Sequence, residues 1–203
     1  QKKLIQNIDA VITVSETSKK DIVRFLNLPA EKVHAIHNAP FPIFRKESDR
    51  KKLNGVVAKY NLPNKFVLYL GDVYYSKNIP TLIMACRDAN VPLVIVGKQA
   101  AEIEAGLQTD LTKINGPKDW LRFLVNKPHP ELSHYKLLKD MFTNEGKVIR
   151  LGFVPDSDLI PIMNLATVYC QPSYYEGFGL GVVHAFACGV PVVISKTQAL
   201  TEI

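Results

Sequence analysis

The sequence predicts a doubly wound parallel α/β sheet, a Rossmann-like arrangement with helices on both faces. Short apolar runs of strand length alternate with amphipathic stretches of helical length, and the apolar runs are rich in Val, Ile and Leu. Strands of this composition separated by helices are typical of a parallel sheet that is buried on both faces. The 203 residues, 47% hydrophobic and 22% charged, have the composition of an ordinary globular protein.

The first predicted elements form a short unit of their own. Asp9–Val14 and Val33–Ile36 read as strands, and Ser15 is placed to cap a helix over Thr17–Leu26. The stretch 38–42, Asn-Ala-Pro-Phe-Pro, is predicted to be a loop because each proline fixes its own φ and restricts the preceding residue. A polar helix follows at Arg50–Tyr60.

From Phe66 onward, five further strands alternate with helices. The predicted strands are Phe66–Leu70, Leu93–Val96, Val148–Leu151, Val168–Gln171 and Val192–Ile194, and the predicted helices are Pro80–Ala89, Asp158–Ala166 and Leu180–Cys188. Pro191 fits the start of the last strand, where a missing N–H matters least. The stretch 98–146 is long for one crossover and contains Pro117, Pro128 and Pro130, so two or three helices are expected within 100–144.

This pattern predicts three parts. Residues 1–45 are expected to be the end of an N-terminal domain, 46–60 a linker with a helix, and 61–203 a nearly complete α/β domain. Parallel sheets of this kind bind ligands beyond the carboxyl ends of their strands.

Composition narrows the class of protein. No apolar run approaches the ~20 residues that cross a bilayer. Cys86, Cys170 and Cys188 show no CxxC spacing and are expected to be reduced, which favours a cytoplasmic location. The net charge of +6 lacks the interleaved aromatic residues of a nucleic-acid surface. Part of the positive charge clusters near the start of the sequence, in Lys2, Lys3, Lys19, Lys20 and Arg24. This cluster is either an ordinary solvated face or a surface that contacts anionic lipids or a phosphorylated ligand.

Two loops after predicted strands carry candidate binding residues. Residues 172–181, Pro-Ser-Tyr-Tyr-Glu-Gly-Phe-Gly-Leu-Gly, lead into a helix whose unpaired N–H groups suit a diphosphate, and Glu176 can accept hydrogen bonds from sugar hydroxyls. An ordinary tight turn is the competing interpretation. Lys77, in the loop that starts at Gly71, is expected at the same edge and can pair with phosphate oxygens, unless it is only a solvated lysine.

Two further strand ends, Gly97-Lys98 and the stretch 151–156, face this edge in the predicted sheet. The histidines show no metal-ligand spacing, and His129 and His134 lack a recognisable partner, so no metal site is predicted. Nucleophile chemistry is not predicted either, because Ser173 has no glycine-flanked elbow.

Together these motifs resemble the retaining, two-domain GT-B glycosyltransferases often called family 4. The matching stretches cover most of the chain: residues 12–21 (Ile-Thr-Val-Ser-Glu-Thr-Ser-Lys-Lys-Asp), 66–71 with Lys77-Asn78, 93–97, 151–156, 172–180 and 187–193. The resemblance implies that 61–203 is the donor-binding domain and that 1–45 ends the acceptor-side domain. It also implies a nucleoside-diphosphate sugar as donor, a glycan or lipid-linked acceptor, and no cofactor or metal ion.

The resemblance assigns roles to particular residues. Lys77 matches the lysine that contacts the donor diphosphate, and Glu176 matches the first glutamate of the family's pair, which holds the donor sugar, so both are expected to be catalytic residues. The backbone of Gly177, Phe178, Gly179 and Leu180 would lie against sugar and phosphate, and Phe153 and Val154 would lie beside the base. Gly71 and Lys98 complete the expected donor site. The whole enzyme is expected to be cytoplasmic or peripheral at the inner face of the membrane, and the chain alone is expected to be inactive.

Three positions depart from the family pattern. His184 stands where the second glutamate usually bonds the ribose, and a histidine is not a fixed anionic acceptor. It is either a donor-site residue of a variant site or a sign of a weakened one. Gly181 replaces the usual proline, and Asp72 replaces a common arginine, a loss of positive charge for which Lys98 can compensate.

Two alternative functions stay open beside a hexosyltransferase. One is a non-catalytic nucleotide-sugar-binding module, and the other is a nucleotide-sugar epimerase of the same architecture. A dehydrogenase-type dinucleotide module ranks below both because Gly71-Asp-Val-Tyr, and not a GxGxxG turn, follows the first strand of the domain.

Overall fold

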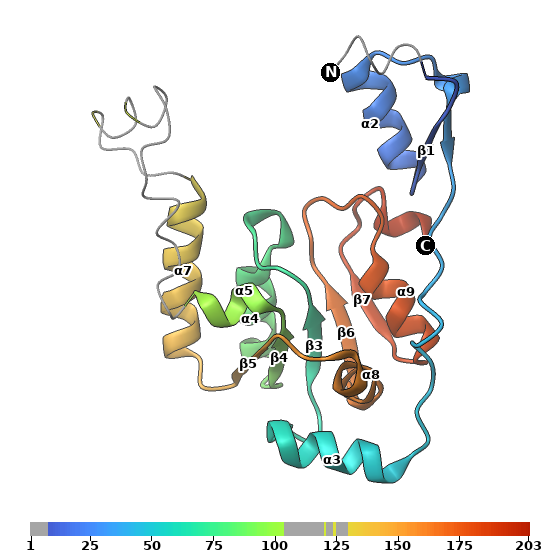
Figure 1. Cartoon of the computed structure of the whole chain (residues 1–203). Helices are drawn as coiled ribbons and strands as arrows, with labels where there is room; N and C mark the ends of the chain where they lie inside the picture. Colours follow the sequence, from blue (N-terminus) through green and yellow to red (C-terminus); the bar gives the residue numbers. More distant parts are fainter. Residues whose placement is uncertain (1–7, 104–119, 121–123, 125–129) are drawn as a thin grey trace.

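The structure is a computed structural model that describes residues 8–103, 120, 124 and 130–203. Its centre is a sheet of five parallel strands in the order β5-β4-β3-β6-β7 (Figure 1). The strands are β3 (Val67–Leu70), β4 (Leu93–Val96), β5 (Val148–Gly152), β6 (Val168–Gln171) and β7 (Val192–Ile194). The sequence prediction of a doubly wound parallel sheet is confirmed, with each strand within a residue of its predicted bounds.

Helices cover both faces of this sheet (Figure 1). One face packs against α3 (Arg50–Tyr60), α8 (Asp156–Leu165) and α9 (Leu180–Ala187), and the other against α4 (Ile79–Asp88), α5 (Lys98–Glu102) and α7 (Pro130–Asn144). Side chains alternate between the faces along each strand, so Leu68 and Tyr69 enter different cores. The predicted helices between 100 and 144 are seen as α5 and α7, and most residues between them lie outside the described part.

A second, smaller unit precedes the large sheet. Here β1 (Val11–Thr13) and β2 (Val33–Ala35) pair in parallel beside α2 (Glu16–Leu26). The predicted cap is confirmed, since the Ser15 hydroxyl accepts a hydrogen bond from Ser18 N–H at 2.9 Å. Figure 1 shows α2 beyond the upper edge of the large sheet, above α9. The division at residues 45 and 60 stays a prediction.

The two units are joined by hydrogen bonds at the start of α2. The Glu202 carboxylate, near the other end of the chain, accepts from the backbone N–H groups of Glu16 (2.7 Å) and Thr17 (2.8 Å) and from the Thr17 hydroxyl (2.6 Å). A carboxylate at this position satisfies unpaired N–H groups and complements the positive end of the helix. Glu202 therefore fixes α2 against the large domain.

Candidate functional site

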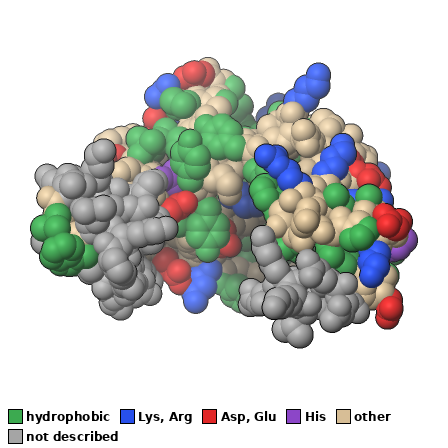
Figure 2. Space-filling model, turned by 90° about the horizontal axis from the view of Figure 1, so that it is seen from above, with side chains coloured by type: hydrophobic (Ala, Val, Ile, Leu, Met, Phe, Trp, Pro, Cys, Tyr) green, Lys and Arg blue, Asp and Glu red, His purple; other side chains and the backbone are tan. Residues whose placement is uncertain are grey.

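The predicted site residues gather at the edge where the parallel strands end. The loops after β3 and β6 meet there, because these strands are neighbours in the sheet. Seen from above, the molecule is hollowed between the side of α7 and the side of α2, with hydrophobic and charged side chains in the hollow (Figure 2). One pocket at this edge is lined by Thr17, Tyr174, Tyr175, Glu176, Lys196, Thr197, Gln198 and Ala199.

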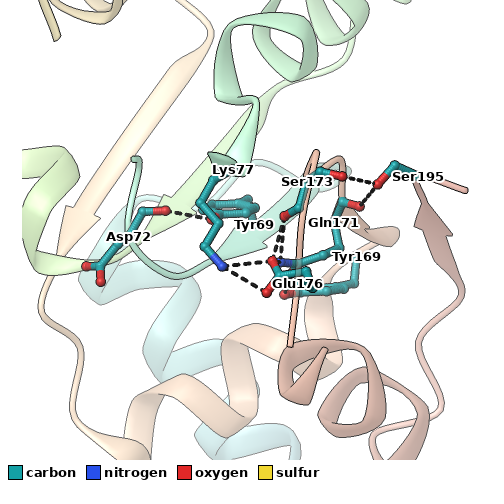
Figure 3. Close-up of polar contacts among 8 residues, drawn as sticks. All are labelled: Tyr69, Asp72, Lys77, Tyr169, Gln171, Ser173, Glu176 and Ser195. Atoms are coloured by element: carbon teal, nitrogen blue, oxygen red, sulfur yellow. Dashed lines mark hydrogen bonds and ion pairs between the residues drawn. The ribbon is translucent and has the colours of Figure 1, made fainter. Parts of the chain in front are cut away.

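Lys77 and Glu176 form an ion pair across these two loops (Figure 3). Lys77 ends the 3-10 helix η2 (Tyr75–Lys77), and its Nζ lies 2.8 Å from Oε1 and 2.9 Å from Oε2 of Glu176. Their side chains are 24% and 11% exposed. The sequence predicted both residues as catalytic, and the structure places them in contact although they are 99 positions apart.

Glu176 is held by two more donors. Gln171 Nε2 and Ser173 Oγ each lie 2.6 Å from Oε1, which therefore accepts three hydrogen bonds including that of Lys77. Within the described residues, Oε2 accepts only from Lys77. A carboxylate has about four lone-pair directions, so Oε2 keeps capacity for a ligand hydroxyl. Gln171 was not predicted as a site residue, and Ser173 was considered only as a nucleophile.

Positions 177–180 form the predicted glycine-rich entry into α9. Gly179 is its N-cap with φ +123°, a left-handed conformation that favours glycine, and a Cβ there would meet Ile203 at 3.0 Å. The Gly177 carbonyl accepts from Ser15 Oγ (2.6 Å) and Ser18 Oγ (3.0 Å) of the small unit. Phe178 is buried, whereas Leu180 is partly exposed at the first helical position. The start of α9 thus opens toward the same edge as the ion pair.

Gly71 and Lys98 lie at the ends of the neighbouring strands β3 and β4. Gly71 has φ +141°, and a Cβ on Gly97 would overlap the Gly71 carbonyl, so the two backbones approach closely. The Lys98 side chain is 76% exposed and lies 3.4 Å from Glu102. Asp72 lies in the same loop as Gly71, and Figure 3 shows its carboxylate pointing away from the ion pair.

The two residues predicted beside the base differ in environment. Phe153 follows β5 and is 78% exposed, whereas Val154 is 5% exposed and belongs to the core that contains α8 and α9. Only the Phe153 side chain is therefore free to contact a ligand without rearrangement.

His184 does not join the Lys77–Glu176 cluster. Its ring stacks on Phe44 with centroids 3.8 Å apart and planes 6° from parallel, and Phe41 lies at 5.2 Å. The side chain is buried, burial lowers its pKa, and its Nε2 has no hydrogen-bond partner among the described residues. The contact with Phe44 joins positions 140 apart, and no local pattern in the sequence indicates it.

Other features bear on metal sites and membranes. In the described part of the chain, no three His, Cys, Asp or Glu side chains are grouped as metal ligands. His134 is buried with Nε2 2.8 Å from the Val73 carbonyl oxygen, and His129 lies outside the described residues. Among residues 8–103, 120, 124 and 130–203, no helix is long and apolar enough to span a membrane. The three cysteines are buried and unpaired.

The fold places the chain in a class of proteins, those with the GT-B fold. HepE from Anabaena, solved with UDP and glucose, superposes with a TM-score of 0.66 at 19% identity over 96% of this chain and 46% of that chain. The likeness at this identity establishes the fold.

The family follows from the sequence comparison. The model of the family described as glycosyl transferases group 1 matches residues 56–203, and the chain belongs to this family. O-antigen chain mannosyltransferase B of Escherichia coli is 30% identical over all of this chain and 48% of its own length. MMP alpha-(1->4)-mannosyltransferase of Mycolicibacterium hassiacum is 27% identical, again over all of this chain, and the match covers 41% of that protein. The chain thus spans about half the length of the curated relatives it matches.

Proposed function

We propose that this chain binds a nucleoside-diphosphate sugar at the Lys77–Glu176 pair, in a glycosyltransferase that moves a hexosyl group to a glycan or lipid-linked acceptor. The observation that carries the proposal is that one site combines three groups suited to binding such a donor. A cation, a carboxylate whose Oε2 keeps acceptor capacity and the start of helix α9 lie at the sheet edge where family members are expected to hold the donor. UDP- and GDP-sugars are the candidate donors. A mannosyl group comes first because the E. coli relative is named a mannosyltransferase.

Each part has a role in transfer. Cleavage of the bond between the anomeric carbon and the diphosphate leaves negative charge on the diphosphate, which Lys77 and the N–H groups at the start of α9 would stabilise. Glu176 would hold sugar hydroxyls and orient the anomeric carbon. The new bond joins that carbon to an acceptor oxygen, whose proton leaves with the diphosphate or solvent. Retained anomeric configuration and independence of a metal ion or cofactor belong to the proposal and rest on the family resemblance.

A peripheral contact with a membrane surface is a further part of the proposal for lipid-linked acceptors. Lys20 and Arg24 on α2 are exposed, and Lys19 is partly exposed. Lys2 and Lys3, from the same predicted cluster, lie outside the described residues. Clusters of basic residues favour anionic headgroups by about 1 kcal/mol per residue.

Binding of defined ligands to this chain tests the donor site. Calorimetric titrations would use GDP-mannose, GDP, UDP-glucose and UDP on the wild type, Lys77→Ala and Glu176→Gln. Lys77→Ala should weaken a diphosphate and its sugar alike, by about tenfold or more, because it removes a charge-assisted contact. Glu176→Gln should weaken only the sugar-bearing ligand.

Lys147→Ala is the matched control. Lys147 precedes β5 at the opposite edge of the sheet, where its ammonium bonds Asn90, and its removal should leave all four affinities unchanged. The proposal fails if the wild type binds none of the ligands, or if Lys77→Ala behaves like Lys147→Ala.

A non-catalytic binding module is the second candidate, favoured by the place of His184. The usual glutamate of this position is replaced by a neutral ring packed on Phe44. Tight donor binding without transfer or hydrolysis in a protein that also carries the acceptor side would support this alternative.

A further inference from the structure

A chain of hydrogen bonds runs from the core of the large domain to Glu176 (Figure 3). Tyr169 and Gln171 lie two residues apart on β6 and so point to the same face of the sheet. The Tyr169 hydroxyl donates to Gln171 Oε1 at 2.5 Å, and Gln171 Nε2 donates to Glu176 Oε1 at 2.6 Å. Tyr169 is fully buried and Gln171 is 5% exposed.

Tyr169, at the buried end of this series of hydrogen bonds, determines which group donates and which accepts at each step. Burial raises the pKa of Tyr169, so the phenol keeps its proton and acts as a donor. Gln171 must then turn its carbonyl oxygen toward Tyr169 and its NH₂ group toward Glu176. The reverse orientation would bring the amide oxygen against the carboxylate and leave a buried hydroxyl without an acceptor, at a cost in stability.

Gly181 leaves the space that the Tyr169 hydroxyl fills. A Cβ at position 181 would overlap this hydroxyl and lie 2.9 Å from Tyr169 Cζ. Any other residue, including the proline that the resemblance leads one to expect here, carries that Cβ. The Tyr169 side chain on β6 therefore requires a glycine at position 181, which lies 12 positions later in the first turn of α9.

We propose that Tyr169 and Gln171 are positioning residues that orient Glu176 toward the donor sugar, and that Gly181 is the glycine that makes room for them. The inference rests on the proposed function, because it takes Glu176 as the residue that contacts the sugar. With Oε1 held by Gln171, Oε2 is the oxygen presented to sugar hydroxyls.

The arrangement keeps Glu176 in place while Lys77 changes partner. Lys77 contacts both carboxylate oxygens, and a diphosphate would attract it away. Gln171 and Ser173 both hold Oε1 independently of Lys77. Glu176 therefore stays oriented when the ammonium turns to the phosphates.

The first test measures the match between Gly181 and Tyr169 by thermal unfolding. Gly181→Ala should lower the Tm by about 3–8 °C, because overpacking a filled site is destabilising in a chain of this size. The same substitution should lower it by less in a Tyr169→Phe background, which removes the overlapping hydroxyl but keeps Cζ 2.9 Å from the new Cβ. Tyr69→Phe is the matched control: its hydroxyl is equally buried but donates to the Asp72 carbonyl oxygen, so the full penalty should persist in that background.

The second test compares the affinities for GDP-mannose and GDP. The ratio of the two affinities should fall by about tenfold in Gln171→Leu, which corresponds to about 1.4 kcal/mol, and by a smaller factor in Tyr169→Phe. The affinity for GDP alone should stay within about twofold of the wild type. Tyr69→Phe should leave the ratio unchanged. A role of Tyr169 and Gln171 in folding alone would not separate the sugar from the nucleotide.

The outcomes separate the two proposals. If the wild type prefers GDP-mannose to GDP and this preference survives Tyr169→Phe and Gln171→Leu, the positioning role is overturned and the donor site stands. If the wild type binds neither ligand, the donor site and the positioning role both fall. The unfolding test still decides the match of Gly181 to Tyr169, which is refuted if Gly181→Ala is equally harmful in both backgrounds.

Discussion

Replacing Glu202 should loosen α2 selectively and leave the large domain intact. Three hydrogen bonds, from the N–H groups of Glu16 and Thr17 and from the Thr17 hydroxyl, end on its carboxylate. Hydrogen bonds to charged groups contribute about 1.5–3 kcal/mol each, and a helix cap about 0.5–2 kcal/mol. These values overlap and the site is partly screened by solvent, so we expect Glu202→Ala to cost about 2–3 kcal/mol and Glu202→Gln about half of that.

Amide hydrogen exchange measures this local loss. A cost of 2–3 kcal/mol predicts that the amides of α2 lose roughly 30- to 150-fold in protection. The amides of α3 are the internal control, because α3 packs against α8 and the described partners of the Glu202 carboxylate, Glu16, Thr17 and His37, all lie outside α3. Unchanged exchange in α2, or an equal loss of protection in α3, would refute the conclusion that Glu202 stabilises α2 locally.

The same interaction carries a pH dependence of known sign. Burial acts to raise the pKa of the Glu202 carboxyl, but the hydrogen bonds from Thr17, Glu16 and His37 outweigh it and hold the pKa below the ordinary value. A lowered pKa in the folded state means that the contribution is complete above the ordinary pKa and is lost as pH falls through the folded one. The difference in α2 stability between wild type and Glu202→Gln should therefore shrink as the pH falls below the ordinary glutamate pKa of about 4.3.

Two further predictions concern backbone space and the buried histidine. Gly97→Ala should destabilise the chain by about 2 kcal/mol or more in denaturant unfolding, because its Cβ would overlap the Gly71 carbonyl. Gly55→Ala is the control and should stabilise the chain by about 0.5–1 kcal/mol, because Gly55 lies in the interior of α3 with open space around its Cβ position. Equal effects of the two substitutions would refute the close approach of Gly97 to Gly71. For His184, a pKa lowered by burial means that stability falls as pH drops below about 6.5, where the unfolded histidine binds a proton. His184→Gln should remove this part of the acid sensitivity, and an unchanged pH profile would contradict the neutral ring stacked on Phe44.

Much of the fold could be predicted because it depends on local patterns. Apolar runs of strand length, with Ser15 as a cap, located the strands and most helices within one or two residues. The meeting of Lys77 and Glu176 was also predictable, because parallel strands bring their following loops to one edge. Period-2 alternation on β6 could in addition have indicated that Tyr169 and Gln171 share a face.

The remainder depends on contacts that have no local signal. The family pattern places His184 in a variant donor site or a weakened one, and no local signal indicates that its ring packs on Phe41 and Phe44, which are distant in sequence. Glu202 caps a helix 185 positions away. Gly181 also lacks a local signal, because the Tyr169 hydroxyl that would overlap a Cβ at this position lies on a different element.

On the proposed function, the ion pair explains why a nucleoside-diphosphate sugar would be preferred to a free sugar. Lys77 contacts both oxygens of Glu176, so a free hexose would have to compete with an ammonium group for Oε2. A diphosphate offers Lys77 more negative charge than the carboxylate does, and the start of α9 adds to its binding. Once Lys77 turns to the phosphates, Oε2 is released for the sugar hydroxyls while Oε1 remains held by Gln171 and Ser173. Sugar binding thus depends on the diphosphate to which the sugar is attached, and a sugar without it gains little from this site.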